Sequence, residues 1–305
     1  MKLRENETQG YLFGLLGVLA FSFTLPFTRI ATRELDPTFV GLGRALLAAL
    51  LSALLLAVTR QPVPTRQQFY GLALVALGVV IGFPLASAWA MHFVPSSHGA
   101  IVNALLPLGT AIGGAVLNRS RPSPVFWFAA VTGSVVVLAF VLMSSGTASI
   151  ASGDALMLIA VALGCLGYVA GGKMSVLIGS WQTICWANII AFPLIIYPVV
   201  SSAVASGIQA SISAWLAFVY LGVISMFLGF FAWYRGLALG GTTRVSQVQL
   251  IQAFLTVLWS ALLLGETVSP LMVGAAILVV AMIFVARRAP ISQAANVYTQ
   301  TQPNP

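Results

Sequence analysis

The chain has 305 residues, of which 59% are hydrophobic and only 7% are charged, and its formal net charge is +8. A soluble domain carries about 25% charged residues, so this chain has too few polar side chains to cover a soluble fold. Lipid must surround it, which excludes a soluble protein.

Ten apolar segments, separated by short polar breaks, are each long enough to cross a membrane. A helix of about 20 apolar residues spans a hydrocarbon core of about 30 Å. In chain order, the predicted spans are residues 10–31, 38–58, 69–93, 97–118, 123–143, 154–177, 180–200, 212–238, 243–264 and 270–287. The sequence predicts an all-α integral membrane protein with ten transmembrane helices and a disordered cytoplasmic tail, 289–305.

Positive charges are unevenly distributed over the ends of these spans. With the N-terminus inside the cell, eleven of the fourteen Lys and Arg residues fall at cytoplasmic span ends, and only Arg29, Arg33 and Arg44 fall on the outer side. Cytoplasmic loops of membrane proteins carry this excess of cations. We therefore expect both termini in the cytoplasm, and we interpret the net charge as a topology signal rather than a nucleic-acid site.

The second half of the chain repeats the pattern of the first at an offset of about 146 residues. Residues 89–119 align with residues 235–265. Each segment ends one span, turns at a Pro/Ser or Gly/Thr joint and enters another span with an amide near its middle. The amide is Asn103 in the first half and Gln249 in the second.

Each half therefore holds five spans, residues 10–143 in the first and 153–288 in the second. Because five is odd, the second half enters the membrane from the opposite side. The predicted architecture is a 5+5 inverted-topology repeat around a central cavity. This symmetry suits a carrier, because exchanging the conformations of two similar halves turns an outward-open state into an inward-open one.

Three stretches carry a resemblance to a known family. Near the end of the chain stands FFAWYRGLALGGTTRVSQVQLIQAFLTVLWSALLLGETVSP, which finishes a helix in Gly-Glu at Glu266. The first half has AMHFVPSSHGAIVNALLPL, with a mid-helix proline at Pro107, and opens on LAFSFTLPFTRIATRELDPTFVGLGRALLAALL, with an arginine at Arg44. These stretches resemble the EamA-type proteins of the drug/metabolite transporter (DMT) superfamily, although Ala253 stands where a proline is common.

The resemblance implies an exporter of small metabolites in a bacterial inner (plasma) membrane, and bacterial exporters of aromatic amino acids are nearest in character. Exporters of other metabolites or of drugs are the alternative. A sugar-nucleotide carrier needs several cations in its cavity, and these spans hold few. A neutral or zwitterionic solute, such as an aromatic or other hydrophobic amino acid, fits better.

Two amides at matching places in the repeat, Asn103 and Gln249, are the first candidates for substrate binding. An unsatisfied polar group inside a membrane is costly, so each amide must face protein or water. Hydrogen bonding between helices is the alternative. Gln247 and Gln252 share the helix of Gln249, but the three side chains cannot all point one way. We favour Gln249 and then Gln247.

Aromatic residues and prolines add further candidates. Trp89, Tyr168 and Trp186 lie in the interior of their spans by count, where they would provide stacking walls and hydrogen-bond donors for a substrate. Pro26 and Pro107 free backbone carbonyls within their helices. These prolines are interpreted as hinges or as backbone sites for a charged group of the substrate, with tolerated packing as the alternative.

Arg44 lies about 10 Å inside its predicted span. A charge within the membrane indicates function by default. Snorkelling to the outer surface, or pairing with Glu34 or Asp36, explains it equally well, and we expect a structural charge.

Groups that carry protons are scarce within the spans. Asp154 and Glu266 sit at predicted span ends, and the other acidic residues fall in the tail or a loop. His92 and His98, near the outer joint of two spans, titrate near neutral pH. We expect facilitated diffusion or exchange by alternating access. A proton-coupled carrier, with these two histidines as its proton-sensitive residues, is the alternative.

Motifs for other chemistry are absent from the sequence. It contains no HExxH, GxSxG or nucleotide-binding loop, so we do not expect an enzyme. Cys165 and Cys185 lie inside spans without metal-ligand spacing, so neither metal nor cofactor is expected. The expected partners are a small-molecule substrate and the lipid bilayer, the chain being a monomer or a weak homodimer. A channel is a remote alternative.

Overall fold

The computed structural model describes residues 2–117, 120–145, 152–265 and 270–293. Its first-half helices are α1 (Lys2–Ser22), α2 (Thr24–Ala31), α3 (Pro37–Val58), α4 (Arg66–Val75), η1 (Ala76–Gly82), α5 (Phe83–Phe93), α6 (Ser96–Asn103), α7 (Leu106–Leu117) and α8 (Pro124–Ser145). The second-half helices are α9 (Ser152–Ile178), α10 (Ser180–Ser206), α11 (Ile212–Tyr220), η2 (Leu221–Leu228), α12 (Gly229–Gly240), α13 (Thr242–Val245), η3 (Ser246–Gln249), α14 (Leu250–Leu264) and α15 (Pro270–Arg288). The two strands are β1 (Ser120–Pro122) and β2 (Ile291–Gln293).

Seven helical stretches in the described residues are long and apolar enough to cross a membrane. They are Asn6–Ala31, Pro37–Val58, Arg66–Phe93, Gly153–Ile178, Ser180–Ser206, Ile212–Gly240 and Thr242–Leu264. Three shorter apolar helical stretches lie at the other predicted spans: Leu106–Leu117, Pro124–Val136 and Ile277–Ala286. Large apolar side chains such as Leu54 and Tyr197 are exposed on the outside, as side chains that face lipid are. The predicted all-helical membrane class is confirmed.

Local sequence explains where several helices begin. The carboxylate of Asp36 caps α3, because it accepts hydrogen bonds from the backbone N–H groups of Thr38 (2.8 Å) and Phe39 (3.1 Å). Gly179 joins α9 to α10 at φ 102°, a conformation that favours glycine. Such short joints place consecutive helices side by side.

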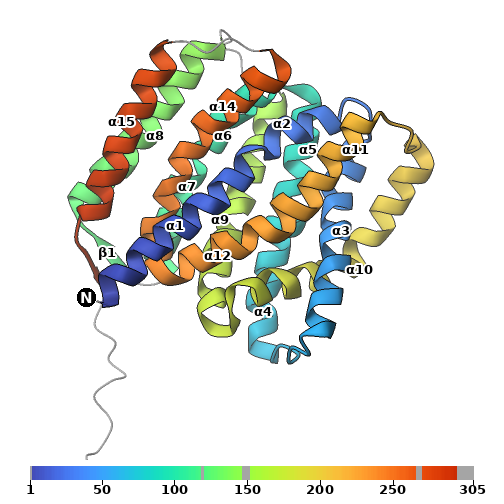
Figure 1. Cartoon of the computed structure of the whole chain (residues 1–305), viewed down its shortest axis with the longest axis horizontal. Coiled ribbons are helices and arrows are strands. Elements are labelled where there is room, and N and C mark those ends of the chain that lie inside the picture. Colours follow the sequence, from blue (N-terminus) through green and yellow to red (C-terminus); the bar gives the residue numbers. More distant parts are fainter. Residues whose placement is uncertain (1, 118–119, 146–151, 266–269, 294–305) are drawn as a thin grey trace, which may run out of the picture.

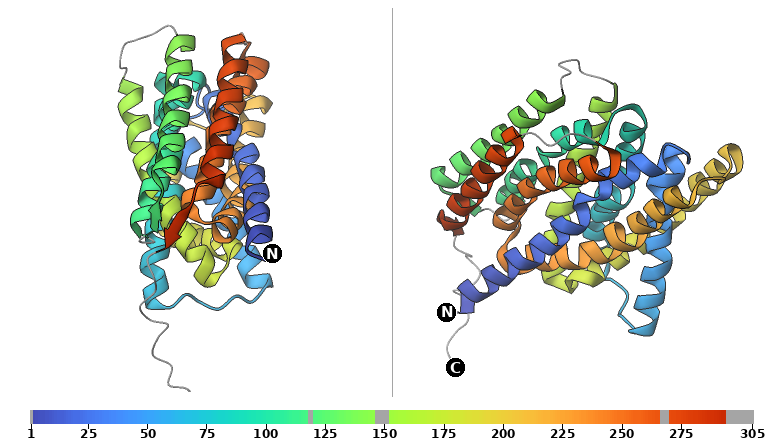
Figure 2. Two further views of the ribbon diagram at one scale, coloured as in Figure 1. Left: turned by 90° about the vertical axis from the view of Figure 1, so that its left-hand side faces the viewer. Right: turned by 45° about the horizontal axis from the view of Figure 1, so that its top comes forward.

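The helices pair in a symmetric pattern: if each span is replaced by the corresponding span of the other half, the same pairs are found. α1 packs along α12 and, equivalently, α9 packs along η1 and α5. α3 packs on α10 at one edge of the molecule, and α8 packs on α15 at the opposite edge (Figures 1 and 2). α14 contacts α6, and η3 contacts α7. The remaining spans of both halves therefore surround the centre of the molecule together.

Central helices lose regular α-helical geometry at matching places in the two halves. The π-helical segments η1 and η2 begin at Ala76 and Leu221, an offset of about 145 residues. In the following span of each half, α6 ends at Asn103 and the 3-10 turn η3 ends at Gln249. Because π-helical segments are frequent at functional sites, these irregularities direct attention to the centre of the molecule.

Close contacts between glycines bring the paired helices together. A Cβ atom added to Gly236 in α12 would lie 2.7 Å from the backbone nitrogen of Gly14 in α1. The corresponding pair, with the roles of the two halves exchanged, is η1 with α9. There a Cβ added to Gly78 would lie 2.5 Å from the backbone nitrogen of Gly167. Small residues at these positions allow the backbones to touch.

Both ends of the described chain lie at the same end of the molecule. β1 pairs with β2 in an antiparallel register that places Ser120 opposite Gln293. Arg244 in α13 forms an ion pair with Glu7 of α1 (2.6 Å) and donates a hydrogen bond to the carbonyl of Ala289, directly after α15 (3.2 Å). The chain therefore returns to the side on which it starts.

Candidate functional site

A small cavity lies at the centre of the molecule, between helices of both halves. It is lined by Phe21, Thr24, Leu25, Arg44, Val79, Phe83, Leu106, Tyr168, Ser225, Met226, Phe230 and Gln252. Its volume is about 30 Å³, room for a water molecule or two, whereas sites for small molecules measure about 300–1,000 Å³. The structure is therefore contracted around this cavity.

Arg44 is the charged residue among the side chains that line the cavity, and it is only 1% exposed. Its Nη2 donates a long hydrogen bond to Ser87 Oγ (3.3 Å), and its Nε has no partner. The acidic residues considered as partners are engaged elsewhere, Glu34 with Ser211 and Asp36 with Ser202. Arg44 neither snorkels to the surface nor pairs with them.

Tyr168 lies near both Arg44 and the amide of Gln249 at the centre of the molecule. Its ring stacks near Phe21, with centroids 6.4 Å apart and an interplanar angle of 16°. The side chain lines the same cavity as Arg44, and its hydroxyl faces the amide of Gln249. The geometry falls short of a hydrogen bond, so both amide atoms of Gln249 stay without a partner. Of the aromatic candidates, Tyr168 lines the cavity.

The three predicted amides, Asn103, Gln247 and Gln249, and the neighbouring Gln252 are all buried and incompletely satisfied. Asn103 Oδ1 has no partner, and neither does Gln247 Oε1, although Gln247 Nε2 lies 3.4 Å from the carbonyl of Pro107. Gln249 is 3% exposed and lies outside the cavity lining. Gln252 lines the cavity instead, with its Oε1 unpartnered. Polar atoms without partners thus gather in α6, η3 and α14 next to the cavity.

At each of the two prolines, a nearby backbone carbonyl accepts a hydrogen bond from a side chain of the other half. Pro26 cannot donate to the carbonyl of Ser22, and that carbonyl accepts a hydrogen bond from Thr256 Oγ1 (2.9 Å). Pro107 lies one residue inside α7, directly after the break from α6, and its carbonyl is the acceptor for Gln247. Both prolines therefore sit where first-half backbone meets the helices η3 and α14.

Trp89 and His92 lie near the end of α5, where it meets the end of α2, rather than in the cavity. Trp89 Nε1 donates to Thr38 Oγ1 (3.2 Å), and the Trp89 ring stands 6.3 Å from the His92 ring. His92 Nδ1 lies 3.4 Å from the carbonyl of Thr32. His98 lies in the first turn of α6, but its side chain is outside the described part of the structure.

Trp186 lies beside the loop before α4, at a surface pocket that also contains Gln61 and Gln182. The structure thus brings Tyr168 and Gln249 together near Arg44 and Gln252, and places Trp89 and Trp186 elsewhere. Among the described residues, no group of three or more His, Cys, Asp and Glu side chains is placed to hold a metal ion.

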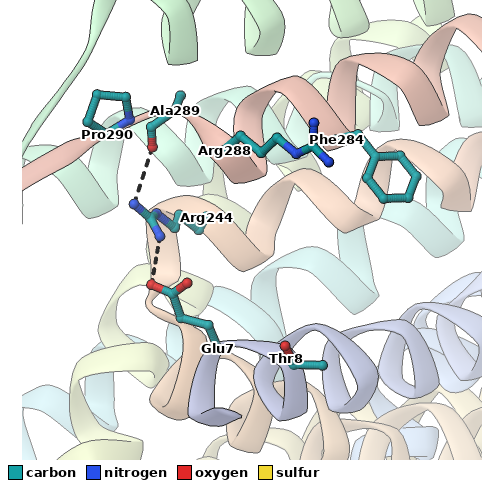
Figure 3. Close-up of a pocket in the computed structure, with 7 residues that line it drawn as sticks. All are labelled: Glu7, Thr8, Arg244, Phe284, Arg288, Ala289 and Pro290. Atoms are coloured by element: carbon teal, nitrogen blue, oxygen red, sulfur yellow. Dashed lines mark hydrogen bonds and ion pairs between the residues drawn. The ribbon is translucent and has the colours of Figure 1, made fainter. Parts of the chain in front are cut away.

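Side-chain contacts join helices at both ends of the molecule. Near the ends of α2 and α5, Arg29 binds the carbonyl groups of Met91 and His92, and Ser96 and Ser260 share a hydrogen bond (2.9 Å). Near the two ends of the described chain, the contacts of Arg244 lie at a surface pocket of about 560 Å³ (Figure 3).

Sequence reasoning missed some polar residues that line the cavity, two with hydroxyl groups and one with an amide. Thr24 Oγ1 and Ser225 Oγ share a hydrogen bond of 2.8 Å between α2 and η2. Gln252 donates to the carbonyl of Phe21 (3.4 Å), which the break between α1 and α2 leaves accessible. The sequence signal was weak: Gln252 lies in the same helical segment as Gln249, but Gln249 itself lies outside the lining.

Known proteins resemble this chain over nearly its whole length. The profile of the EamA-like transporter family matches twice, at residues 8–145 and 151–288. "Uncharacterized transporter YdeK" of Bacillus subtilis (strain 168) is 40% identical over 284 residues, which are 93% of this chain and 99% of that protein. A crystal structure described only as that of a protein has a TM-score of 0.72 at 17% identity, covering 92% of this chain and 96% of the other. That likeness concerns the fold alone.

Proposed function

The chain belongs to the EamA-like transporter family and is a multi-pass membrane transporter, and from this premise we propose that it exports a small amino acid-like metabolite by alternating access. The observation that carries the proposal is the small central cavity, which both halves line. A carrier needs one site that each half can expose to its own side of the membrane.

We infer ten spans in two inverted halves, residues 10–143 and 153–288. Three observations support this reading: the pairing pattern that is unchanged on exchange of the halves, the π-helical segments at matching positions, and the meeting of both chain ends at one end of the molecule. An even number of crossings returns the chain to its starting side. The excess of cations at span ends on that side supports a cytoplasmic location for both termini, and the family resemblance supports the inner (plasma) membrane of a bacterium.

The lining of the cavity suits a solute with an apolar body and one polar end. Phe21, Phe83 and Phe230 supply aromatic walls. Thr24 and Ser225 supply hydroxyl groups, which orient a substrate by hydrogen bonds. An aromatic or other hydrophobic amino acid has this shape, and export is the direction that the family resemblance implies.

Transport is proposed to run as facilitated diffusion or exchange, because the cavity lining in the described structure contains no Asp, Glu or His. A pH gradient alone should then drive no uphill transport into reconstituted vesicles. Uphill transport driven by that gradient would contradict the proposal. If a His92→Gln or His98→Gln variant abolished this driving, the histidine would be identified as the coupling group.

The experiment for the proposed function is solute flux into liposomes that contain the purified chain. A panel of radiolabelled amino acids, nucleosides and dyes should identify an amino acid as an accepted solute. The Asn103→Ala and Gln249→Ala variants should lower its flux, while Gln67→Ala, at an exposed position before the third span, should not. Unchanged flux in both cavity-side variants would refute the site, and no flux of any solute would refute the function.

A further inference from the structure

We propose that Arg44 is the counter-ion of the transported solute and binds its carboxylate group in the central cavity. The inference rests on the proposed transport function and names the chemical class of its substrate: a monocarboxylate with an apolar body.

The first step is the burial of a charge without a partner. Arg44 is 1% exposed, and in the described part of the chain no carboxylate lies within 4.0 Å of its guanidinium group. Its hydrogen bond to Ser87 is long, and Nε has no partner. An isolated buried charge is strongly destabilising unless it is paired or hydrogen-bonded. The fold therefore retains a cation for which the described part of the chain provides no carboxylate partner.

The second step is the position of that cation. Arg44 lines the cavity together with Tyr168 and Gln252. The planar guanidinium group presents donors in a fork that matches a carboxylate in two parallel hydrogen bonds. The Tyr168 hydroxyl is a further donor on the same cavity, whereas the unpartnered Oε1 of Gln252 is an acceptor and does not bind a carboxylate. A carboxylate placed there would pair the charge where it stands.

The third step is the choice of anion. Arg44 is the one charged residue among the described residues that line the cavity, so the site balances a single negative charge. A phosphate monoester carries about −1.5 to −2 charges at neutral pH and would leave the excess unpaired. The walls are formed by Phe21, Phe230 and other apolar side chains, which favour an apolar body behind the carboxylate.

The fourth step concerns the amino group of such a solute. The described lining holds no carboxylate to pair with an ammonium group. The ammonium group can meet only hydroxyl or carbonyl oxygens, such as those of Thr24 and Ser225. The carboxylate is therefore the required group, and the amino group is tolerated rather than required.

The experiment compares four probes with one body: L-phenylalanine, 3-phenylpropionate, L-phenylalaninamide and phenethylamine. A second series uses L-leucine, 4-methylpentanoate, L-leucinamide and isopentylamine. Binding is measured as the ligand-dependent shift in thermal unfolding of the purified chain, and flux is measured in liposomes. In wild type, the two acids of at least one series should bind at least tenfold more tightly than the amide and the amine. This comparison requires no variant.

The variants then locate the selectivity. Arg44→Gln should remove the preference for the acids, and Arg44→Lys should keep part of it, since a point charge replaces the fork. Arg235→Gln removes the same charge at an exposed position and should leave the preference unchanged. If Arg44→Gln fails to fold, the wild-type comparison decides.

Outcomes separate this inference from the proposed function. Flux of nucleosides or dyes without binding of any acid would overturn the role of Arg44 while transport stands. Equal binding of acids, amides and amines, or an unchanged acid preference in folded Arg44→Gln, would also overturn it. No flux of any solute in either panel would remove the proposed function and this inference together.

Discussion

Several polar side chains at or near the cavity have atoms without a hydrogen-bond partner. Gln249 leaves both amide atoms unpartnered, and Arg44 leaves Nε unpartnered. In comparison, Asn188 lies away from the cavity and donates to Ser52 Oγ (3.1 Å), which ties α10 to α3, although its own Oδ1 has no partner. Polar atoms without partners lower stability where they stand, and those at the cavity are the ones that a bound ligand could satisfy.

Replacing Gln249 by methionine tests this distinction. Methionine has a similar length and removes two unsatisfied buried polar atoms, so thermal stability in detergent should stay equal or rise, by up to about 1–3 kcal/mol. Solute flux should fall about tenfold, because an amide that faces Tyr168 is lost. Asn188→Leu is the matched control, with stability lower by about 1 kcal/mol and flux unchanged. Lower stability in Gln249→Met would contradict the assignment.

Sequence reasoning located the amides but not their directions. The repeat alignment placed Asn103 and Gln249 at matching positions, and the structure puts each beside a break in its helix. The η3 segment has 3-10 geometry, which alters the angle between successive side chains. For that reason a regular helical count could not show that Gln252 reaches the cavity. The sequence also could not show whether Arg44 snorkels to the surface or pairs with Glu34 or Asp36. In the structure these two carboxylates bind Ser211 and Ser202 instead.

Helices in this protein touch where two glycines meet, and the contact can be tested at one position. A Cβ at Gly236 would lie 2.7 Å from the backbone nitrogen of Gly14 and 2.8 Å from the carbonyl oxygen of Gly10. Gly236→Val should therefore destabilise the protein by more than about 2 kcal/mol in thermal unfolding, since backbone must move. Gly274→Ala, with nothing within 4 Å of the added Cβ, should gain about 0.5–1 kcal/mol. Equal stability of both variants would refute the close packing.

Two carboxylates in the loop between α2 and α3 predict that the stability of the fold depends on pH. Hydrogen bonds from the backbone N–H and the hydroxyl of Ser211 lower the pKa of Glu34. Partial burial raises the pKa of Asp36, but hydrogen bonds from Ser202, Phe39 and Thr38 outweigh it and leave that pKa lowered. A pKa that is lower in the folded state adds stability above the unfolded value, and this stability is lost as pH falls through the folded value.

The unfolding temperature of the wild type should therefore fall as the pH drops below about 4. A Glu34→Gln, Asp36→Asn double variant should have a lower unfolding temperature at neutral pH and a flatter acid limb. Thermal unfolding from pH 7 to pH 3 checks both. The same acid slope in wild type and variant would show that these contacts do not contribute.

At the scale of whole elements, hydropathy predicted where helices lie better than how they are built. The segments 69–93 and 212–238 were each predicted as one span, and both contain a π-helical stretch, η1 and η2. Apolar residues satisfy the membrane in either geometry, so composition does not distinguish an α turn from a π turn. The break between α1 and α2 falls before Pro26, the residue whose missing N–H the sequence did reveal.

For the molecule as a whole, helices from both halves of the chain meet around a small central cavity. The contacts of Arg29 and those of Glu7 with Arg244 lie at opposite ends of the first long helical stretch, Asn6–Ala31. In the proposed alternating access, one set of contacts would break while the other is kept, with the π-helical segments and helix breaks as the places where backbone can adjust. The inverted 5+5 repeat, predicted from an odd number of spans per half, stays a proposal. The contacts themselves could not be predicted, because they join side chains of residues that are distant in the sequence.

Counterflow in liposomes tests the central claim most directly. Vesicles are loaded with an unlabelled accepted solute, and uptake of the same labelled solute is followed against external concentration. A carrier with one alternating site predicts saturable uptake that internal solute accelerates. Uptake that rises linearly with concentration and ignores the solute inside would contradict the account, because it would describe a pore.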